Sequence, residues 1–335
     1  MNWVHTCNWW RNHCSLRTVY LLFLGQLVSF SLALSSFTSS LVANLGVDAP
    51  LTQSSFNYLA LALVYGSILL YRRQKLRIPW YLYLLLGVVD VQGNYLVNKA
   101  YQFSSITSVT LLDCFTIAWV IVLTWFFLGT RYSIWQLLGA VVCVIGLGLV
   151  LLSDAGVGGG GGSKPLLGDT LVIAGTIFFA FSNVGEEYCV KKKDRIEVVA
   201  MIGLYGFLTS IVELSILELK SLESTRWSAD IILALAGYTL SQFSFYTLAP
   251  FVLNMSGATL FNLSILTSDM WAVVVRIFFY HQQVDWLYYL AFSVVVIGLI
   301  IYSLTEKEPA PDDGNSYQVL SYDENTEPRI QYSAN

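Results

Sequence analysis

The chain has 335 residues, of which 56% are hydrophobic and only 12% are charged, and its formal net charge is −4. Soluble domains have about 25% charged residues, so this composition excludes an ordinary soluble domain and indicates a membrane protein. The charge balance also argues against a nucleic-acid-binding protein, which would carry a basic surface.

Ten apolar segments follow a polar N-terminal tail at 1–17. Each has roughly the 20 residues that an α-helix needs to cross ~30 Å of hydrocarbon. The prolines, Pro250 included, lie at or outside the segment ends, where a missing backbone N–H does least harm. We therefore predict an all-α membrane protein with ten transmembrane helices, near residues 18–42, 52–71, 79–101, 105–128, 133–153, 168–190, 197–219, 229–249, 256–280 and 285–304.

Lysine and arginine are distributed unequally between the two sets of loops. With the N-terminus inside, the inner side holds most of them, whereas the outer side keeps only Lys164, Lys220 and Arg226. Positive residues are retained on the cytoplasmic side, so we predict that both termini are cytoplasmic. The tail at 305–335 is polar and acidic and is predicted to be disordered. Its Tyr-Gln-Val-Leu at 317–320 has the form of a sorting signal, which favours the plasma membrane or a post-Golgi endomembrane.

The two halves of the chain, 18–153 and 168–304, share a pattern at a constant spacing of 152. Val-Ile-Gly-Leu occurs at 144–147 and again at 296–299, and Trp119 matches Trp271. Five helices per copy is an odd number, so the second copy enters the membrane inverted, as in many secondary transporters. The segment between them, 154–167, is a glycine-rich run that we interpret as a flexible outer linker.

Several charged side chains fall where hydrocarbon is expected, and a charge there is costly unless it faces a partner or water. Asp90 lies about 11 residues into its helix, or roughly 16 Å deep. Lys99 and Asp113 flank a tight outer turn near Ser104, so a flexible lysine could bridge to the carboxylate. The alternatives are a permanent structural ion pair or a lysine that extends to the surface.

Two more acidic sites lie in the second half. Asp269 stands beside Ser268 and seven residues before Arg276, and a carboxylate there could bind an amine-bearing solute or carry a proton. Glu186 and Glu187 lie close to the predicted inner surface, so interfacial solvation is expected for at least one of them. These acids complete a set of polar candidates distributed over both halves.

Several motifs together resemble solute carrier family 35, in its F-type branch, which belongs to the drug/metabolite transporter superfamily. They are Leu-Leu-Leu-Gly-Val-Val-Asp at 84–90, Asn-Tyr at 94–95, Ala-Tyr-Gln at 100–102, Thr-Ser-Val at 107–109, Leu-Leu-Asp-Cys-Phe at 111–115, Ser-Asn-Val-Gly-Glu-Glu-Tyr at 182–188 and Leu-Thr-Ser-Asp at 266–269. The resemblance spans the ten predicted helices and implies a carrier with two inverted five-helix repeats. Lys99 departs from the family pattern, in which animal relatives carry Arg at this position. The positive charge is kept, but a lysine cannot bind an anion through the two parallel N–H groups of a guanidinium.

The candidate residues for substrate binding or coupling are Asp90, Asn94, Lys99, Asp113, Asn183, Glu186, Asn262 and Asp269. The resemblance implies a secondary transporter that moves a small polar organic solute, such as a purine-like nucleobase or nucleoside compound, by alternating access. Relatives in other branches exchange nucleotide sugars, so a nucleotide-sugar or nucleotide antiporter of endomembranes is one alternative. A non-transporting membrane scaffold or sensor is another.

An enzyme is not expected, because the chain has only three His and no nucleophile, base and orienting residue can be assembled from it. The spacing of His5, Cys7, His13 and Cys14 fits no standard zinc pattern, so we expect neither a metal nor a cofactor. The expected partners are a small-molecule substrate, membrane lipid and a coupling proton, and no nucleic acid.

Overall fold

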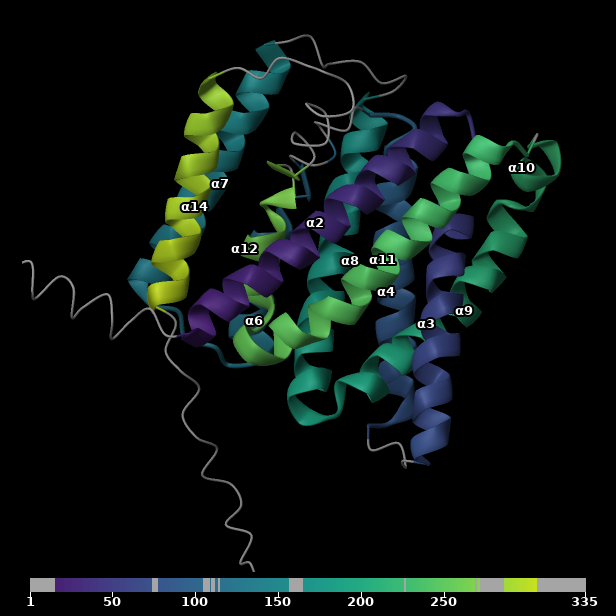
Figure 1. The fold of residues 1–335 in the computed structure, drawn as a ribbon, viewed down its shortest axis with the longest axis horizontal. Helices are drawn as coiled ribbons and strands as arrows, with labels where there is room; N and C mark the ends of the chain where they lie inside the picture. Colours follow the sequence, from purple (N-terminus) through teal and green to yellow (C-terminus); the bar gives the residue numbers. More distant parts are fainter. Residues whose placement is uncertain are drawn as a thin grey trace, which may run out of the picture. The chain divides into compact units, whose positions relative to one another are not determined.

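The computed structural model describes residues 16–73, 78–104, 109, 112–113, 115–156, 165–225, 227–268, 270–271 and 286–305. Its helices are α2 (Leu16–Asn44), α3 (Pro50–Arg72), α4 (Trp80–Ala100), α6 (Phe115–Phe127), α7 (Ile134–Gly156), α8 (Pro165–Lys192), α9 (Arg195–Leu217), α10 (Leu219–Ser224), α11 (Ala229–Ser256), α12 (Ala258–Ile265) and α14 (Trp286–Thr305) (Figure 1). Asp269, Arg276, most of the glycine-rich linker and the tail from 306 lie outside the described residues.

The all-α prediction is confirmed, since the described ranges contain no β-strand. By length and composition, five of the described helices could cross a membrane: Val19–Asn44, Pro50–Arg72, Leu166–Lys192, Arg195–Leu217 and Ala229–Ser256. Three shorter apolar helices, Phe115–Phe127, Ile134–Gly146 and Ser293–Thr305, accompany them. The number of crossings stays a prediction.

One predicted helix boundary is wrong. The segment expected to end at 249 continues through Pro250 to Ser256 as part of α11. Proline is tolerated inside membrane helices because neighbouring groups satisfy the backbone that it frees. The helix instead ends at Gly257, whose φ of 87° is readily adopted only by glycine, and α12 begins directly after it.

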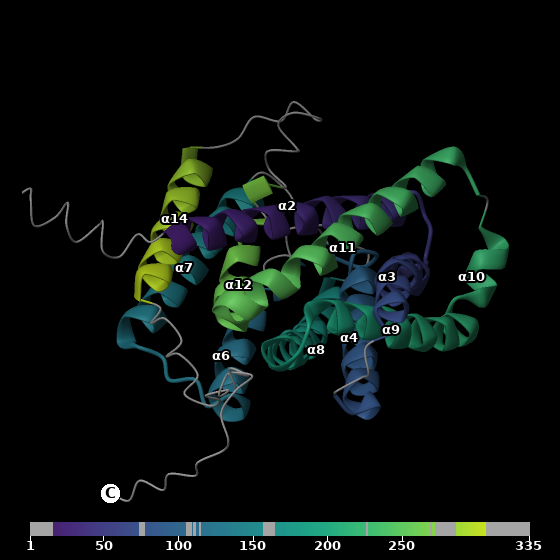
Figure 2. The same cartoon turned by 60° about the horizontal axis from the view of Figure 1, so that its bottom comes forward.

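The helices associate largely in antiparallel pairs: α2 with α11, α3 with α9, α4 with α8, and α7 with α14 (Figures 1 and 2). In the third pair, Gly175 of α8 faces Val97 of α4 and Gly185 faces Leu86. Residue numbers therefore increase along α8 in the direction in which they decrease along α4, and the two helices are antiparallel. Each of these four pairs joins a helix of the first half of the chain to a helix of the second half. The core of the protein is therefore formed between the halves rather than within each.

Glycine allows a close contact between α7 and α14. A Cβ at Gly298 would lie 2.6 Å from Cys143 Sγ and 2.8 Å from the Cys143 backbone nitrogen. A Cβ at Gly139 would meet the Gly298 carbonyl oxygen at 2.9 Å. Small residues at such positions let two membrane helices approach at backbone distance, which strengthens their van der Waals packing.

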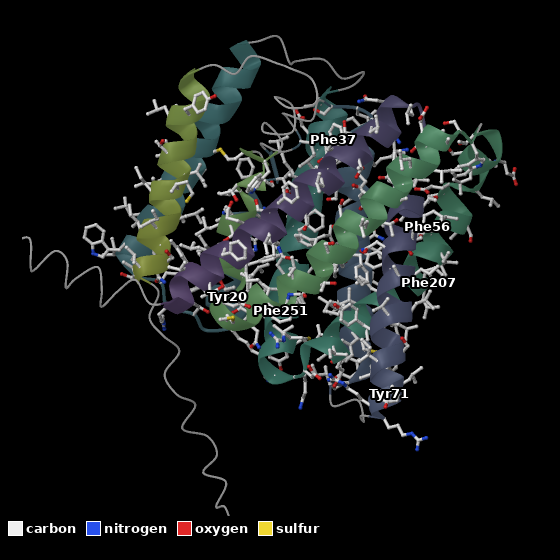
Figure 3. The ribbon with its side chains drawn as sticks, viewed as in Figure 1. Tyr20, Phe37, Phe56, Tyr71, Phe207 and Phe251 are labelled. Atoms are coloured by element: carbon white, nitrogen blue, oxygen red, sulfur yellow. The ribbon has the colours of Figure 1, made fainter. Side chains whose placement is uncertain are left out.

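Large apolar side chains remain exposed along the outside of the helices. Leu70 is 79% exposed, Tyr71 90% and Ile134 83%, and Phe56 and Tyr71 are among the side chains marked in Figure 3. A water-soluble monomer rarely exposes such extended apolar surface. Lipid tails, which are as apolar as these side chains, account for it.

Contacts at both ends hold α3 against α9. At one end, Arg72 Nη1 lies 3.0 Å from Asp194 Oδ2. At the other, the Glu218 carboxylate accepts the backbone N–H groups of Leu51 at 2.5 Å and Thr52 at 3.0 Å, and the Thr52 hydroxyl at 2.8 Å. The first N–H groups of a helix have no partner within it, so Glu218 acts as a cap supplied from another helix.

Burial raises the pKa of Glu218 above its ordinary value of 4.5, and the hydrogen bonds from Leu51 and Thr52 oppose that rise. A carboxyl whose folded-state pKa is raised contributes most to stability below its unfolded pKa, and the contribution decreases as pH rises through the folded value. We therefore expect the unfolding midpoint of the wild-type protein to fall, relative to Glu218→Gln, as pH increases from about 4.5.

The measurement is thermal unfolding in one detergent across that pH range, with Glu223→Gln on the exposed side of α10 as the matched control. Glu218→Ala should be destabilised at every pH, by about 1–3 kcal/mol for each buried N–H left without an acceptor. Parallel pH profiles for the wild type and Glu218→Gln would contradict this role of Glu218.

Candidate functional site

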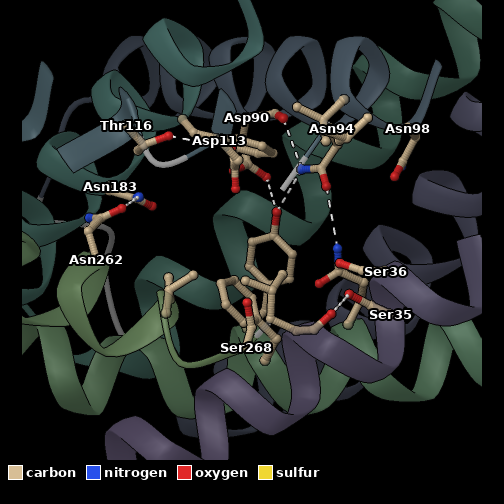
Figure 4. Close-up of a pocket in the computed structure, with 18 of the residues that line it drawn as sticks. Ser35, Ser36, Asp90, Asn94, Asn98, Asp113, Thr116, Asn183, Asn262 and Ser268 are labelled. Carbon is tan, nitrogen blue, oxygen red and sulfur yellow. Dashed lines mark hydrogen bonds between the residues drawn. The ribbon is translucent and has the colours of Figure 1, made fainter. Parts of the chain in front are cut away.

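A cavity of about 100 Å³ lies among α2, α4, α8, α11 and α12 (Figure 4). Six of the eight residues predicted to bind substrate or couple transport line it: Asp90, Asn94, Asp113, Asn183, Glu186 and Asn262. They come from positions distributed over more than half of the chain. The structure therefore places side chains together that the sequence marked only as individual polar residues in apolar helices.

Asp90 accepts three side-chain hydrogen bonds, and only 4% of its surface is exposed. Its Oδ2 accepts the hydroxyl groups of Tyr58 at 2.6 Å and Tyr246 at 2.5 Å, and its Oδ1 accepts that of Ser182 at 2.8 Å. The three donors stand on α3, α11 and α8. Hydrogen bonds of this kind to a charged oxygen are stronger than neutral ones, so Asp90 connects four helices at one point.

Asn94 and Asn98 continue this polar stripe along α4, one helical turn apart. Asn94 Nδ2 donates to the Asp90 carbonyl and to the hydroxyls of Tyr58 and Tyr246, each at 3.0 Å. Asn98 Nδ2 donates to the Tyr238 hydroxyl at 3.0 Å. The spacing of 90, 94 and 98 was the sequence signal for this stripe, and Asn98 was missed because only charges and family motifs were weighed.

A second polar contact joins α8 to α12. Asn183 Nδ2 donates to Asn262 Oδ1 at 3.0 Å, and Asn262 Nδ2 donates to the Ala258 carbonyl at 2.7 Å. Asp113 faces the same cavity, and its Oδ1 accepts the Thr116 hydroxyl at 3.4 Å. Compared with Asp90, the Asp113 carboxylate is weakly bonded and open to the cavity.

Glu186 and Glu187 have different surroundings although they are adjacent. Both are buried, at 4% and 3% exposure, so the expected interfacial solvation is wrong for both. Glu187 accepts the Ala258 N–H at the start of α12 at 2.7 Å and pairs with Lys191, and these partners replace water. Glu186 lines the cavity, and its Oε1 has no hydrogen-bond partner.

Lys99 does not line the cavity and does not pair with Asp113. Its ammonium forms an ion pair with Asp48 in the link between α2 and α3, and Gln102 Nε2 donates to the same carboxylate at 2.7 Å. A structural ion pair was one of the alternatives for Lys99, but its partner was not foreseen. Asp48 is 51 residues earlier in the chain, and nothing in the local sequence relates the two.

Several cavity residues were not predicted at all: Ser36, Tyr238, Gln242, Phe245 and Tyr246. Tyrosine and glutamine in apolar helices are common enough that neither draws attention alone. In the described part of the chain, no group of three or more His, Cys, Asp and Glu side chains is placed to hold a metal ion. The chemistry that the site offers is hydrogen bonding by amides, hydroxyls and carboxylates.

A family model described as "Solute carrier family 35" matches residues 15–304. "Solute carrier family 35 member F2" of Mus musculus is 38% identical over 291 residues, which cover 84% of this chain and 78% of that protein. The protein of the same name from Xenopus tropicalis is 34% identical over 315 residues, covering 90% and 81%. A solved structure titled "Crystal structure of protein" has a TM-score of 0.67 at 19% identity and covers 87% of this chain and 99% of its own, so its likeness concerns the fold alone.

We expect Tyr58→Phe to destabilise the protein more than Tyr65→Phe. The Tyr58 hydroxyl donates to a buried carboxylate, a bond worth about 1.5–3 kcal/mol, whereas that of Tyr65 donates to the Thr247 hydroxyl, worth about 0.5–1.5 kcal/mol. Both changes remove one oxygen from α3, so each controls for the other. Thermal unfolding of the two variants in the same detergent provides the comparison, and equal midpoints would show that Asp90 does not depend on this donor.

Proposed function

The chain belongs to solute carrier family 35, a family of membrane solute carriers, and from this premise we propose that it is a secondary transporter of a small polar organic solute that binds in the cavity between its halves. Family membership indicates a transporter rather than an enzyme. The observation that carries the proposal is the convergence of Asp90, Asn94, Asp113, Asn183, Glu186 and Asn262 on one cavity. Polar groups that converge inside a membrane bundle are the usual mark of a substrate or ion path.

We further propose that the protein has ten transmembrane helices in two inverted repeats. We number the helices one to ten in chain order and leave out the short α10. The pairs described above are then the first with the eighth (α2–α11), the second with the seventh (α3–α9), the third with the sixth (α4–α8) and the fifth with the tenth (α7–α14). Exchanging the halves turns this set of pairs into itself. The second and seventh helices, α3 and α9, are equivalent and run antiparallel, which supports an axis in the membrane plane and alternating access.

Contacts between equivalent residues support the same symmetry. Asn94 Nδ2 donates to the Tyr246 hydroxyl, and Cys143 Sγ donates to the Val295 carbonyl at 3.5 Å. Both pairs are separated by 152 residues, the spacing at which the sequence motifs recur. A residue close to a two-fold axis contacts its own equivalent, so these pairs would lie beside the axis and next to the cavity.

The lining of the cavity favours a purine-like nucleobase or nucleoside compound over a nucleotide sugar. Among its described residues there is no Lys or Arg, and it contains the carboxylates of Asp90, Asp113 and Glu186. Phosphate groups are usually bound by cationic side chains, and buried carboxylates would repel them. Its volume of about 100 Å³ is below the roughly 300–1,000 Å³ of common ligand pockets, as expected for a closed stage of the transport cycle.

We expect Asp113→Asn to lower solute uptake by at least about tenfold while leaving the amount of protein in the membrane unchanged. The change keeps size and most hydrogen bonding but removes the charge and proton exchange, and tenfold corresponds to about 1.4 kcal/mol of lost interaction. Asp269→Asn, in the helix of the second half that is predicted to be equivalent, is expected to behave likewise. If either acid carries a coupling proton, its variant should also lose the pH dependence of uptake.

Uptake of a metabolite library into proteoliposomes measures this, with Asp230→Asn, an exposed acid at the start of α11, as the matched control. Parental rates and parental pH profiles in both Asp→Asn variants would make these acids structural. Solute-dependent thermal stabilisation without any uptake would favour the scaffold or sensor over the transporter.

For orientation, we propose cytoplasmic termini and an outer glycine-rich linker. Loops predicted on one side contact one another: Arg72 pairs with Asp194 on the predicted inner side, and Asp48 contacts Lys99 and Ser221 on the predicted outer side. A peptide tag inserted at Gly160 should then be labelled by a membrane-impermeant reagent from the outside of the cell or from the lumen of an organelle. Labelling only from the cytosolic side would reverse the assignment.

A further inference from the structure

Two residues that line the cavity each have a buried oxygen that accepts no hydrogen bond from the described residues: Oε1 of Glu186 on α8 and Oε1 of Gln242 on α11. Glu186 is 4% exposed and Gln242 is 6% exposed. A buried acceptor without a donor costs about 1–3 kcal/mol, and more when it carries a charge. Two residues with such an atom line the same cavity, where a bound molecule could supply the missing donors.

The orientation of the Gln242 amide follows from its neighbours. Asn94 Nδ2 donates to the Asp90 carbonyl, which can only accept, so Asn94 Oδ1 must face the other way. Gln242 Nε2 lies 3.4 Å from that oxygen and 3.2 Å from the Tyr238 hydroxyl. The amide nitrogen is therefore used within the protein, and the amide oxygen is the atom left without a donor.

The charge of Glu186 has no described counter-ion. No Lys or Arg is among the described residues that line the cavity. Lys99, the basic residue in the last turn of α4, forms an ion pair with Asp48 instead. Glu187, next in the chain, shows how the protein treats an acid that has only a structural role, with a backbone N–H and a lysine as partners. Glu186 is buried to the same extent and lacks both.

We propose that Glu186 and Gln242 form a recognition subsite for a planar cationic group with two N–H donors on one edge, of the amidinium or guanidinium type. A carboxylate binds such an edge through two parallel N–H···O bonds, and the amide oxygen of Gln242, which lines the same cavity, would be a second acceptor for its remaining N–H groups. The subsite rests on the proposed function, since it names the solute class that the cavity selects. It also accounts for acceptor atoms that the hydrogen-bond network around Asp90 leaves unused.

The test uses three isosteric probes, benzamidinium, benzamide and benzoate, which differ in charge and in the donors on one edge. Thermal unfolding of the full-length protein in lipid nanodiscs is followed as each probe is titrated, because a ligand that binds only the folded state raises the midpoint. We expect benzamidinium to stabilise the wild-type protein, benzamide to bind about tenfold or more weakly, and benzoate to give no shift.

Glu186→Gln should weaken benzamidinium binding by about ten- to hundredfold and abolish its advantage over benzamide. Glu213→Gln is the matched control, a partly buried glutamate of α9 that does not line the cavity, and it should keep the wild-type order. Glu186→Met, which is similar in volume and carries no acceptor, is measured beside it so that a folding failure of one variant does not decide the result.

The subsite is overturned if Glu186→Gln keeps the preference for benzamidinium, if benzoate binds as well as benzamidinium, or if no probe stabilises the wild type. Failure of the proposed function gives a different result. The expected order of binding, with no accumulation of benzamidinium or any library solute in proteoliposomes, would keep the subsite and reject transport. Uptake of library solutes that Glu186→Gln leaves unchanged would keep transport and reject the subsite.

Discussion

The cost of burying polar groups in a membrane determines how this protein is packed. α4 has Asp90, Asn94 and Asn98 on one face, and in hydrocarbon each of them needs a partner from another helix. The hydroxyls of Tyr58, Ser182 and Tyr246 meet that need for Asp90 from three directions. Because the partners belong to α3, α8 and α11, satisfying one carboxylate draws helices of both halves around α4.

The acids of the cavity differ in how far the protein itself supplies their hydrogen-bond donors, and this difference distinguishes a structural acid from one that can bind a solute. Asp90 has a donor on each oxygen, so its charge is compensated by the protein and a solute would have to displace a tyrosine to reach it. Among the described residues, Asp113 has one long bond and Glu186 has an oxygen without a donor. The less bonded acids are therefore the ones available for a solute or a proton, while Asp90 holds the scaffold that positions them.

Contacts at the helix ends have a different character from those in the middle. At one end, Glu218 caps α3 and Asp48 binds Lys99; at the other, Glu187 binds the first N–H of α12 and Lys191. The two caps are buried, but in each ion pair one side chain is exposed, Asp48 at 44% and Lys191 at 45%, so these pairs can exchange a partner for water at lower cost. A polar centre with separable contacts at both ends is the arrangement that alternating access requires, which agrees with the proposed transport cycle.

The sequence by itself determined the membrane class, the all-helical fold and the approximate place of most of the described helices, because a stretch of about 20 apolar residues has no other stable solution in lipid. It also singled out six of the residues that line the cavity, since a polar group in such a stretch demands an explanation. Only the tertiary structure decided their partners: Tyr246 lies 156 residues from Asp90, and Asp48 lies 51 residues from Lys99. It also decided that Glu186 faces the cavity while Glu187 faces α12, because successive residues of a helix point about 100° apart and the packing of neighbouring helices sets which direction is inward.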